Sequence, residues 1–341
     1  MNNYMLNSIK LASIAACVPK HIDFTKLYDL FTSEEAILYE KRTGIKSKHT
    51  SNGRYTTSDL CFHAAEKALH DLKWKPEDIG LLLFISQTPD YALPSTSVIL
   101  QGKLGLPANC MSLDIRLGCT GWVTGLSIAG SLMKTFGITK ALLLTGETNI
   151  LSNYSDTSTY PLMGDAGTAT ALELDDKSND IFFNFSSTGD KFDAIIAPCS
   201  GARYISEKND PDISLSIQTS MNGPDIYEFV LLHVLPSITN LLNEVFLSVN
   251  DIDHFVFHQA NKLIIESLRK KLDIPIEKCP YSLTDFGNTS SASIPLTLLT
   301  QIKNFKGKSR KIFCSSFGVG LSLANVIIET NELFCADLIE I

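Results

Sequence analysis

The sequence lacks the cysteine pairs on which disulfide frameworks and zinc sites are built. Eight cysteines are scattered over 341 residues, without a Cys-x-x-Cys pair or a His/Cys spacing suited to zinc. We therefore expect reduced thiols, no metal site and a cytoplasmic protein. A long apolar run is missing as well. No stretch of about 18 residues is apolar and free of charge, so the sequence predicts no transmembrane span.

An excess of basic residues is also absent. The net charge is −8, which argues against a nucleic-acid binder because that function needs a basic face to neutralise phosphates. An anionic partner would have to meet a local basic patch. Charge runs on helices are usually solvated faces, and that remains the alternative interpretation. Two segments are rich in basic side chains: one carries Lys262, Arg269, Lys270 and Lys271, the other Lys303, Lys306, Lys308, Arg310 and Lys311.

The glycine-rich motifs of nucleotide-binding proteins are missing too. No GxGxxG follows the first strand-like run, and the Gly-Lys-Ser at 307–309 has Ile302 where a phosphate-binding loop needs its first glycine. The GLSIAG run at 125–130 misses the GxSxG pattern of serine hydrolases by one residue. These absences argue against nucleotide binding and serine-hydrolase chemistry.

What the sequence does contain is an alternation of strand-like and helix-like segments. The first half predicts strands at 79–87, 111–116 and 141–147 and helices at 95–105 and 119–137. This alternation is typical of an α/β fold. The helix that starts at 119 is apolar or small on nearly every face, so we expect it to lie between layers, its glycines close to other parts of the chain.

The second half repeats the alternation. It predicts helices at 222–246, 261–274 and 291–305 and strands at 252–260 and 311–318. Each half also has a glycine-punctuated turn before a strand-like run, GDAGTATALEL in one and FGVGLSLANVII in the other. We interpret the repeat as a weak internal duplication. The predicted halves span 1–176 and 177–341 and share one continuous core.

Cys119 lies where a strand-like run passes through Leu117 and Gly118 into the apolar helix. A thiol at a helix N-terminus meets the positive end of the peptide dipoles, which favours the thiolate that attacks carbonyl carbons. A buried core cysteine is the alternative. Two later segments favour the catalytic interpretation, because FVFHQAN supplies His258 and DFGNTSSAS supplies Asn288. Two α/β halves that meet at a pseudo-twofold axis would bring the three side chains into one cleft.

These three side chains have a shared chemistry. A thiolate beside an imidazole and an amide can form an acyl thioester, and the other two groups can then stabilise an oxyanion or enolate. Papain-type hydrolases use the same residue types, but the local cysteine context of that family is absent here. A core histidine satisfied by hydrogen bonds is the alternative role for His258.

Beyond these residues, the chain resembles the β-ketoacyl-acyl carrier protein synthase III family of thiolase-like condensing enzymes. The likeness runs through KRTGIKSKH, TPDYALPSTS, DIRLGCTG, GDAGTATAL, FHQAN, GNTSSASIP and FGVGLS. It implies a thiolase-like α/β fold, in which two duplicated halves pack as layered sheets and helices around a buried helix. It also implies a homodimer, an acyl thioester substrate, an acyl carrier protein as partner and no cofactor.

The resemblance also implies a role for each residue of the motifs. Cys119 would take the primer acyl group as a thioester, while His258 and Asn288 would hold the thioester carbonyl of a malonyl-type extender as carbon dioxide leaves. The backbone N–H groups of Cys119 and Val319 would form the oxyanion hole. Phe317, followed by Gly318 in the FGVG turn, would pack beside the thiol.

Other family positions concern the substrate tunnel and the carrier protein. Arg42 is retained near the tunnel mouth, and Gly223 lies in MNGPDIY, which resembles the pantetheine-contacting segment. Leu93 aligns near the phenylalanine by which the partner subunit closes the acyl pocket, which implies a different and longer pocket. The resemblance places carrier-protein docking on Lys262, Arg269, Lys270 and Lys271.

Two departures from the family concern the primer donor. Synthases that take their primer from coenzyme A hold adenine between a tryptophan before the RTG segment and an arginine before the GD turn. The only tryptophans here are Trp74 and Trp122, and DTSTYPLM before Gly164 has no arginine. We therefore expect a decarboxylating condensation in a specialised lipid or secondary-metabolite pathway, primed by an acyl-carrier protein. The alternatives are acyl transfer from Cys119 to a hydroxyl or amine without decarboxylation, and a catalytically silent scaffold.

Overall fold

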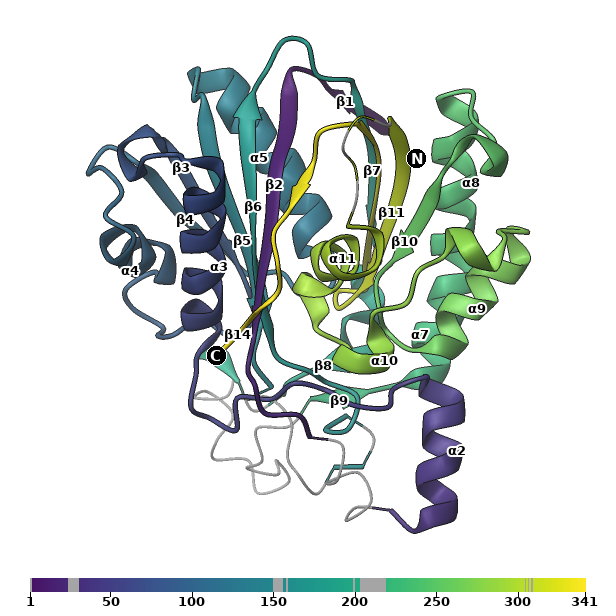
Figure 1. Ribbon diagram of the computed structural model, residues 1–341. Coiled ribbons are helices and arrows are strands. Elements are labelled where there is room, and N and C mark those ends of the chain that lie inside the picture. Colours follow the sequence, from purple (N-terminus) through teal and green to yellow (C-terminus); the bar gives the residue numbers. More distant parts are fainter. Residues whose placement is uncertain are drawn as a thin grey trace.

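Two β-sheets and the helices around them make up the protein (Figure 1). The computed structural model describes residues 2–23, 31–149, 156–157, 159–198, 200–202, 219–303, 305, 307 and 309–341. In these ranges, no helix is both long and apolar enough to cross a membrane.

The first sheet carries the strands predicted for the N-terminal half. Its order is β13-β2-β6-β5-β3-β4, and β14 also pairs with β2. Strands β4, β3 and β5 run parallel, so their carboxyl ends meet at one edge of the sheet. The strands are β2 (Ile9–Val18), β3 (Leu81–Ile85), β4 (Met111–Ile115), β5 (Lys140–Glu147), β6 (Ala166–Leu174), β13 (Phe334–Cys335) and β14 (Ile339–Glu340).

The second sheet has the order β1-β7-β12-β11-β10. Its β10 runs parallel to β11, while β12 is antiparallel to both β11 and β7. A separate two-stranded sheet joins β8 (Ile195–Ile196) to β9 (Ser220–Met221). The strands of the second sheet are β1 (Asn3–Leu6), β7 (Ile181–Ser187), β10 (His254–Phe257), β11 (Arg310–Gly318) and β12 (Ser322–Thr330).

The helices form three layers around the sheets. Figure 1 shows α5 and α11 between the two sheets, α3 and α4 outside the first, and α8 and α9 outside the second. The α-helices are α2 (Ser33–Thr43), α3 (Thr57–Leu72), α4 (Thr96–Lys103), α5 (Gly121–Phe136), α7 (Gly223–Phe229), α8 (Leu235–Glu244), α9 (Lys262–Lys271), α10 (Leu283–Phe286) and α11 (Ser293–Thr297). π-Helical turns at Val230–Val234 and Leu298–Ile302 join α7 to α8 and extend α11, and 3-10 turns lie at Pro76–Asp78, Gly189–Ala194, Val249–Asp251, Ile276–Lys278 and Ser290–Ala292.

The central position of α5 confirms the prediction made from its composition. Its buried face packs on the first sheet, and Trp122, almost fully buried, donates a hydrogen bond to Thr170 Oγ1 at 2.9 Å. A Cβ at Gly125 would lie 2.4 Å from Ile85 Cδ1, and one at Gly130 would lie 2.3 Å from a methyl carbon of Leu6. Glycine at these two positions therefore allows the helix to approach the sheet closely.

The predicted elements form with small shifts in their boundaries. The helix predicted from residue 119 begins at Gly121, so Cys119 lies in the turn before it, where Gly121 N–H donates to Gly118 O at 2.7 Å. The helix predicted at 222–246 forms as α7, a π-helical turn and α8 without a break. The predicted start was thus two residues too early, at Cys119 instead of Gly121.

Strand order supports the proposed duplication. The series β2-β6-β5-β3 in the first sheet has the same order and relative directions as β7-β12-β11-β10 in the second. The chain ends cross over, because β1 joins the second sheet and β13 and β14 join the first. Side chains of both sheets meet in one hydrophobic cluster, which fills the space between them, and two further clusters include residues of α3 and α4 and of α8 and α9.

Candidate active site

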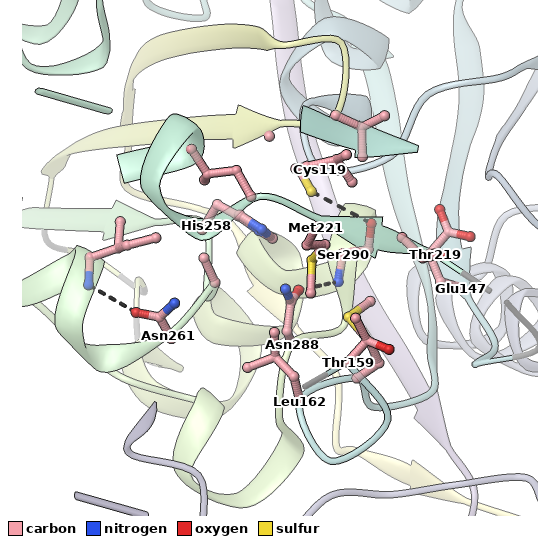
Figure 2. Close-up of a pocket in the computed structure, with 18 of the residues that line it drawn as sticks. Cys119, Glu147, Thr159, Leu162, Thr219, Met221, His258, Asn261, Asn288 and Ser290 are labelled. Carbon is pink, nitrogen blue, oxygen red and sulfur yellow. Dashed lines mark hydrogen bonds between the residues drawn. The ribbon is translucent and has the colours of Figure 1, made fainter. Parts of the chain in front are cut away.

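A cavity of about 640 Å³ lies where loops from both halves meet. Figure 2 shows Cys119, His258 and Asn288 around it. Cys119 comes from the turn between β4 and α5, His258 follows β10, and Asn288 follows α10. The three predicted catalytic residues therefore line one cavity, although Cys119 precedes the other two by more than 130 positions in the sequence.

The Cys119 thiol is half-buried, and its surroundings act on its pKa in both directions. Burial raises the pKa of the Cys119 thiol above its ordinary value, although hydrogen bonds from the Val319 backbone, the Ser290 side chain and its own backbone act in the opposite direction. Ser290 Oγ lies 3.9 Å from Sγ. Burial therefore opposes the stabilisation of the thiolate that the helix end and these donors give.

The backbone around the thiol fits the predicted oxyanion hole. The backbones of Val319 and Cys119 lie close enough to Sγ to favour the thiolate and so act to lower the pKa of the thiol, which places both N–H groups beside the atom to which an acyl group would be attached. Gly318 has φ of 153°, and a Cβ there would lie 2.6 Å from Cys119 Sγ. Only glycine therefore allows the chain to pass this close to the thiol.

His258 is a neutral imidazole held from one side. Its Nδ1 lies 2.8 Å from Ser293 Oγ, and its backbone N–H donates to Ser315 O at 2.8 Å. Burial lowers the pKa of His258 to about 3. The ring of Phe317 meets the imidazole edge to face, with 5.7 Å between centroids. Because Nδ1 is occupied, Nε2 is the nitrogen left for the cavity.

Asn288 is oriented by its own loop. Its Oδ1 accepts the Ser290 N–H at 2.9 Å (Figure 2), so its Nδ2 amide is left for the cavity. Its backbone N–H donates to Leu162 O at 2.8 Å, and its carbonyl accepts from Gly164 N–H at 3.0 Å. A Cβ at Gly164 would lie 2.0 Å from Phe286 O. The GD turn thus clamps the Asn288 loop at a distance that only glycine permits.

Glu147 was not singled out from the sequence, yet it lies on the same cavity wall. Its carboxylate accepts the Gln87 N–H at 3.0 and 3.1 Å, the Ser86 hydroxyl at 3.0 Å and the Thr88 hydroxyl at 2.9 Å. Burial raises the pKa of Glu147 to about 8, against the effect of these donors. The available signal was an acidic residue at the end of an otherwise apolar strand.

The predicted tunnel residues fall into two groups. Gly223, Phe317 and Gly318 line the cavity. Arg42 is exposed at the end of α2, where its neighbours Tyr39 and Thr43 line the cavity. The structure therefore places Arg42 at the rim rather than on the wall.

Neither tryptophan lies at this entrance. Trp122 is buried in the core, and Trp74 packs under the Lys140 ammonium at 4.9 Å from the ring centroid. Leu38, which stands in the helix before Arg42, is 47% exposed. The exposed position before Arg42 is thus aliphatic, and the aromatic residue of the same helix, Tyr39, lies on the cavity wall.

The basic residues of α9 differ in their exposure and in their hydrogen-bond partners. Lys262, Lys270 and Lys271 are exposed. Arg269 is instead held by Glu266, through hydrogen bonds of 3.0 and 2.8 Å, and by Ile274 O at 2.9 Å. Its guanidinium therefore stabilises the end of α9. Lys270 also lies 3.8 Å from Glu266 Oε2, yet it is exposed like Lys262 and Lys271, so these three lysines present positive charge on this surface.

Metal ligands do not gather in the ranges that the structure describes, where no group of three or more His, Cys, Asp or Glu side chains could hold an ion.

Layered sheets around a buried helix, with Cys, His and Asn at one cavity, define a thiolase-like condensing enzyme. Two family models match the sequence, 3-oxoacyl-[acyl-carrier-protein] synthase III over residues 113–190 and the C-terminal region of the same family over 242–330. The chain belongs to the β-ketoacyl-acyl carrier protein synthase III family of acyltransferases.

Similar proteins cover nearly the whole chain. A β-ketoacyl-[acyl-carrier-protein] synthase III of Campylobacter fetus is 32% identical over 331 residues, which is 95% of this chain and 98% of that protein. The crystal structure of a 3-oxoacyl-(acyl-carrier protein) synthase from Burkholderia xenovorans superposes with a TM-score of 0.94 at 32% identity, covering 100% of this chain and 99% of that one. A priming β-ketosynthase of a polyketide pathway reaches a TM-score of 0.84 at 25% identity, covering 95% and 97%.

Proposed function

We propose that this enzyme loads an acyl primer on Cys119 and condenses it with a malonyl group on an acyl carrier protein, with loss of carbon dioxide. One observation carries the proposal: Cys119, the Val319 backbone beside its sulfur, the neutral His258 and Asn288 all line the same cavity. The site thus offers one pair of donors for the acyl-enzyme and another for the extender.

Loading is a thioester exchange. The Cys119 sulfur forms a bond to the acyl carbon, the bond from that carbon to the donor sulfur breaks, and the thiol proton leaves with the donor thiol. The developing oxyanion accepts hydrogen bonds from the two N–H groups, each worth about 3 kcal/mol at this kind of position. Because burial raises the pKa of the free thiol, the proton leaves as the acyl donor arrives rather than beforehand.

Condensation uses the other pair of donors. Nδ1 of the neutral His258 lies 2.8 Å from the Ser293 hydroxyl. With that hydroxyl as the donor, the imidazole carries its proton on Nε2, and Nε2–H donates a hydrogen bond to the extender carbonyl. Asn288 Nδ2 donates to the same oxygen. The carbon–carboxylate bond then breaks, carbon dioxide leaves, and the electron pair forms an enolate. The enolate carbon attacks the acyl carbon, and the bond to Cys119 sulfur breaks.

We propose a carrier protein as the primer donor. The exposed Lys262, Lys270 and Lys271 offer positive charge to an acidic carrier, and the exposed side chain before Arg42 is the aliphatic Leu38, where an adenine clamp would place a tryptophan. A lost stacking contact of roughly 1–3 kcal/mol weakens coenzyme A binding by about one to two decades. Acyl-carrier protein should therefore outperform the matching acyl-coenzyme A, and equal loading from both would contradict the assignment.

Two departures from the family also support a specialised lipid or secondary-metabolite pathway in the cytoplasm: no tryptophan precedes the RTG segment, and Leu93 stands near the position of the family's phenylalanine. Seven of the eight cysteines lie in the described ranges, and all seven are free thiols, as a reducing compartment favours.

We further propose that the enzyme is a homodimer joined through β4. In the described ranges β4 is the outer strand of its sheet and pairs only with β3, and its Leu113 is 41% exposed. Beside it, Tyr91 and Leu93 are 62% and 87% exposed. An apolar edge strand is a template for pairing with a second copy about a two-fold axis.

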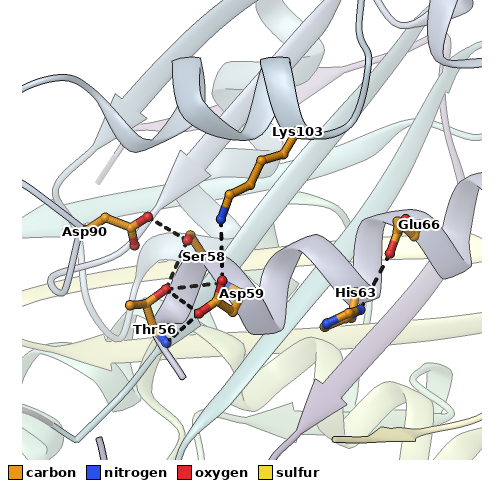
Figure 3. A network of polar contacts seen from close by, with 7 residues as sticks. All are labelled: Thr56, Ser58, Asp59, His63, Glu66, Asp90 and Lys103. Atoms are coloured by element: carbon orange, nitrogen blue, oxygen red, sulfur yellow. Dashed lines mark hydrogen bonds and ion pairs between the residues drawn. The ribbon is translucent and has the colours of Figure 1, made fainter. Parts of the chain in front are cut away.

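A hydrogen bond from α3 fixes the start of the loop that carries Leu93. Figure 3 shows the Ser58 hydroxyl donating to Asp90 at 2.7 Å, next to Asp59, which accepts from Lys103 at 3.5 Å. These contacts join α3 and α4 to the base of the loop. Leu93 itself is 87% exposed, and we propose that in the dimer it reaches the cavity of the partner.

The experiment separates the two chemical steps. Intact-protein mass spectrometry should show acyl loading on wild-type enzyme and none on Cys119→Ser, because a hydroxyl is scarcely ionised where a thiol can lose its proton. His258→Ala and Asn288→Ala should still load but lose decarboxylation by at least about a hundredfold. Gln301→Met, an exposed change on another element, is the control.

Three results would contradict the proposal. Acyl groups retained by Cys119→Ser would move the nucleophile elsewhere. Condensation at the wild-type rate by either alanine variant would remove that residue from the mechanism. Loading followed by transfer to a hydroxyl or amine, without release of carbon dioxide, would instead favour a non-decarboxylating acyltransferase.

A further inference from the structure

The cavity wall next to the nucleophile is polar rather than apolar. Gln87 and Thr88 follow β3, and Glu147, Thr148 and Asn149 lie at and after the end of β5, on the wall that Cys119 also lines. Strands β3 and β5 are parallel neighbours, with Ile85 opposite Thr145. Their carboxyl ends therefore bring five polar side chains to the wall where an acyl chain on Cys119 would lie.

The backbone of Gln87 is fixed at this wall. Both oxygens of the buried Glu147 carboxylate accept its N–H, at 3.0 and 3.1 Å. The same carboxylate accepts from the hydroxyl groups of Ser86 and Thr88 on either side. The segment that carries the Gln87 side chain is thus held by hydrogen bonds on three consecutive residues.

The side chain of Gln87 lies against the residue before the nucleophile. A Cβ on Gly118 would be 2.1 Å from Gln87 Oε1 and 2.6 Å from its Cδ. The carboxamide therefore occupies the space that any larger residue at 118 would fill, one peptide unit from Cys119. An acyl chain that extends from Cys119 along this wall would pass the carboxamide within its first few carbons.

The carboxamide has unused hydrogen-bonding capacity. Gln87 is half-buried, and among the residues that the structure describes no side chain or backbone group bonds to its amide or carbonyl. An amide offers two donors and an acceptor with two lone pairs. An apolar acyl chain at this position would remove water from the amide without replacing its hydrogen bonds. The loss of those hydrogen bonds costs free energy, so binding of an apolar chain is disfavoured here.

We propose that Gln87 determines primer specificity by binding a hydroxyl or carbonyl oxygen on the first few carbons of the acyl chain carried by Cys119. The inference rests on the proposed acyl loading of Cys119 and adds the class of primer. A wall that hydrogen-bonds a substrate hydroxyl rejects the matching apolar group more strongly than an apolar wall rejects an added methyl group.

Two isosteric primers test the proposal. The rate of loading on Cys119 is measured by intact-protein mass spectrometry with 3-hydroxybutyryl-pantetheine and 3-methylbutyryl-pantetheine, which differ by a hydroxyl in place of a methyl group. Wild-type enzyme should prefer the hydroxyacyl primer by about tenfold or more. Gln87→Met, which keeps the length and removes the amide, should bring the ratio to within about threefold of unity. Gln301→Met should leave the wild-type ratio.

Each outcome decides between the two claims. Equal loading of the two primers by the wild type, or a preference that Gln87→Met retains, would overturn the role of Gln87 and leave Cys119 as the nucleophile. Loading of neither primer, nor of any other acyl donor, would overturn the proposed function and this inference with it. The wild-type ratio alone is decisive if Gln87→Met fails to fold.

Discussion

The protonation of His258 decides how the site stabilises an enolate. A charged imidazole would be costly in this buried position, whereas a neutral one can still donate a single hydrogen bond if the other nitrogen accepts. Ser293 Oγ, 2.8 Å from Nδ1, supplies that arrangement. The serine lies one helical turn beyond Asn288, so the GNTSSASIP motif contributes both the amide donor and the group that orients the histidine.

The role of Ser293 gives a prediction that separates positioning from folding. In Ser293→Ala the neutral imidazole loses its partner at Nδ1, and decarboxylation should slow by about tenfold, the value of one such hydrogen bond. Loading of Cys119 should stay within about twofold, and Ser293→Thr should restore most of the activity. If both steps slowed equally, Ser293 would be structural only.

The buried imidazole also predicts how stability depends on pH. Burial lowers the pKa of His258 to about 3 from the ordinary 6.5, so between these values only the unfolded chain takes up a proton. The free energy of unfolding therefore decreases as the pH drops below 6.5. Urea unfolding at pH 6.5 and about pH 5 should show the wild type losing about 2 kcal/mol more than His258→Gln. Equal losses would indicate that the imidazole titrates as in water.

Residues such as Gln87 and Glu147 show where sequence analysis ends. Cys119, His258 and Asn288 stand in motifs, and the structure brings them to one cavity. The contact between Gln87 and Glu147 depends on the parallel pairing of β3 with β5. No local spacing encodes it, because the two residues are sixty positions apart in the chain.

At the scale of elements, α9 combines a buried face with a basic end. Ile264, Ile265 and Leu268 are buried, and Asn261 caps the helix by accepting Ile264 N–H at 2.9 Å. The sequence pattern predicted this amphipathic helix. It could not show that Arg269 would be bound by Glu266, because both side chains were equally able to face the solvent.

The exposed lysines of α9 give a prediction about the carrier protein. Lys270→Glu with Lys271→Glu should lower the second-order rate of loading from acyl-carrier protein by about tenfold at low salt, and by less as salt screens the charges. Loading from acyl-coenzyme A should change little. The control is Lys75→Glu with Lys177→Glu, two exposed lysines at the opposite end of the first sheet. Equal losses with both donors would contradict docking at α9.

At the scale of the whole molecule, the alternation of strands and helices predicted the α/β class and most element boundaries. What it could not predict is how the chain ends are used. The C-terminal β13 and β14 return to pair with β2, and the N-terminal β1 pairs with β7. These strands are only two to four residues long, and pairings between distant short segments carry no periodic signal.

The dimer is a prediction at the same scale. Static light scattering at micromolar concentration should give the mass of two chains for the wild type. Leu113→Lys places a charge on the exposed edge strand and should yield monomers. Phe136→Lys, a matched change of another exposed apolar residue at the end of α5, should remain dimeric. A monomeric wild type would contradict both the dimer and the contribution of Leu93 to a partner's cavity.

The measurement that tests the central claim most directly is the release of carbon dioxide from malonyl-acyl carrier protein by the purified enzyme, followed together with the mass of the carrier. With an acyl primer already loaded on Cys119, one carbon dioxide should be released for each β-ketoacyl-carrier formed, and Cys119→Ser should form no β-ketoacyl product. A wild-type enzyme that accepts the acyl group and never releases carbon dioxide would contradict the account.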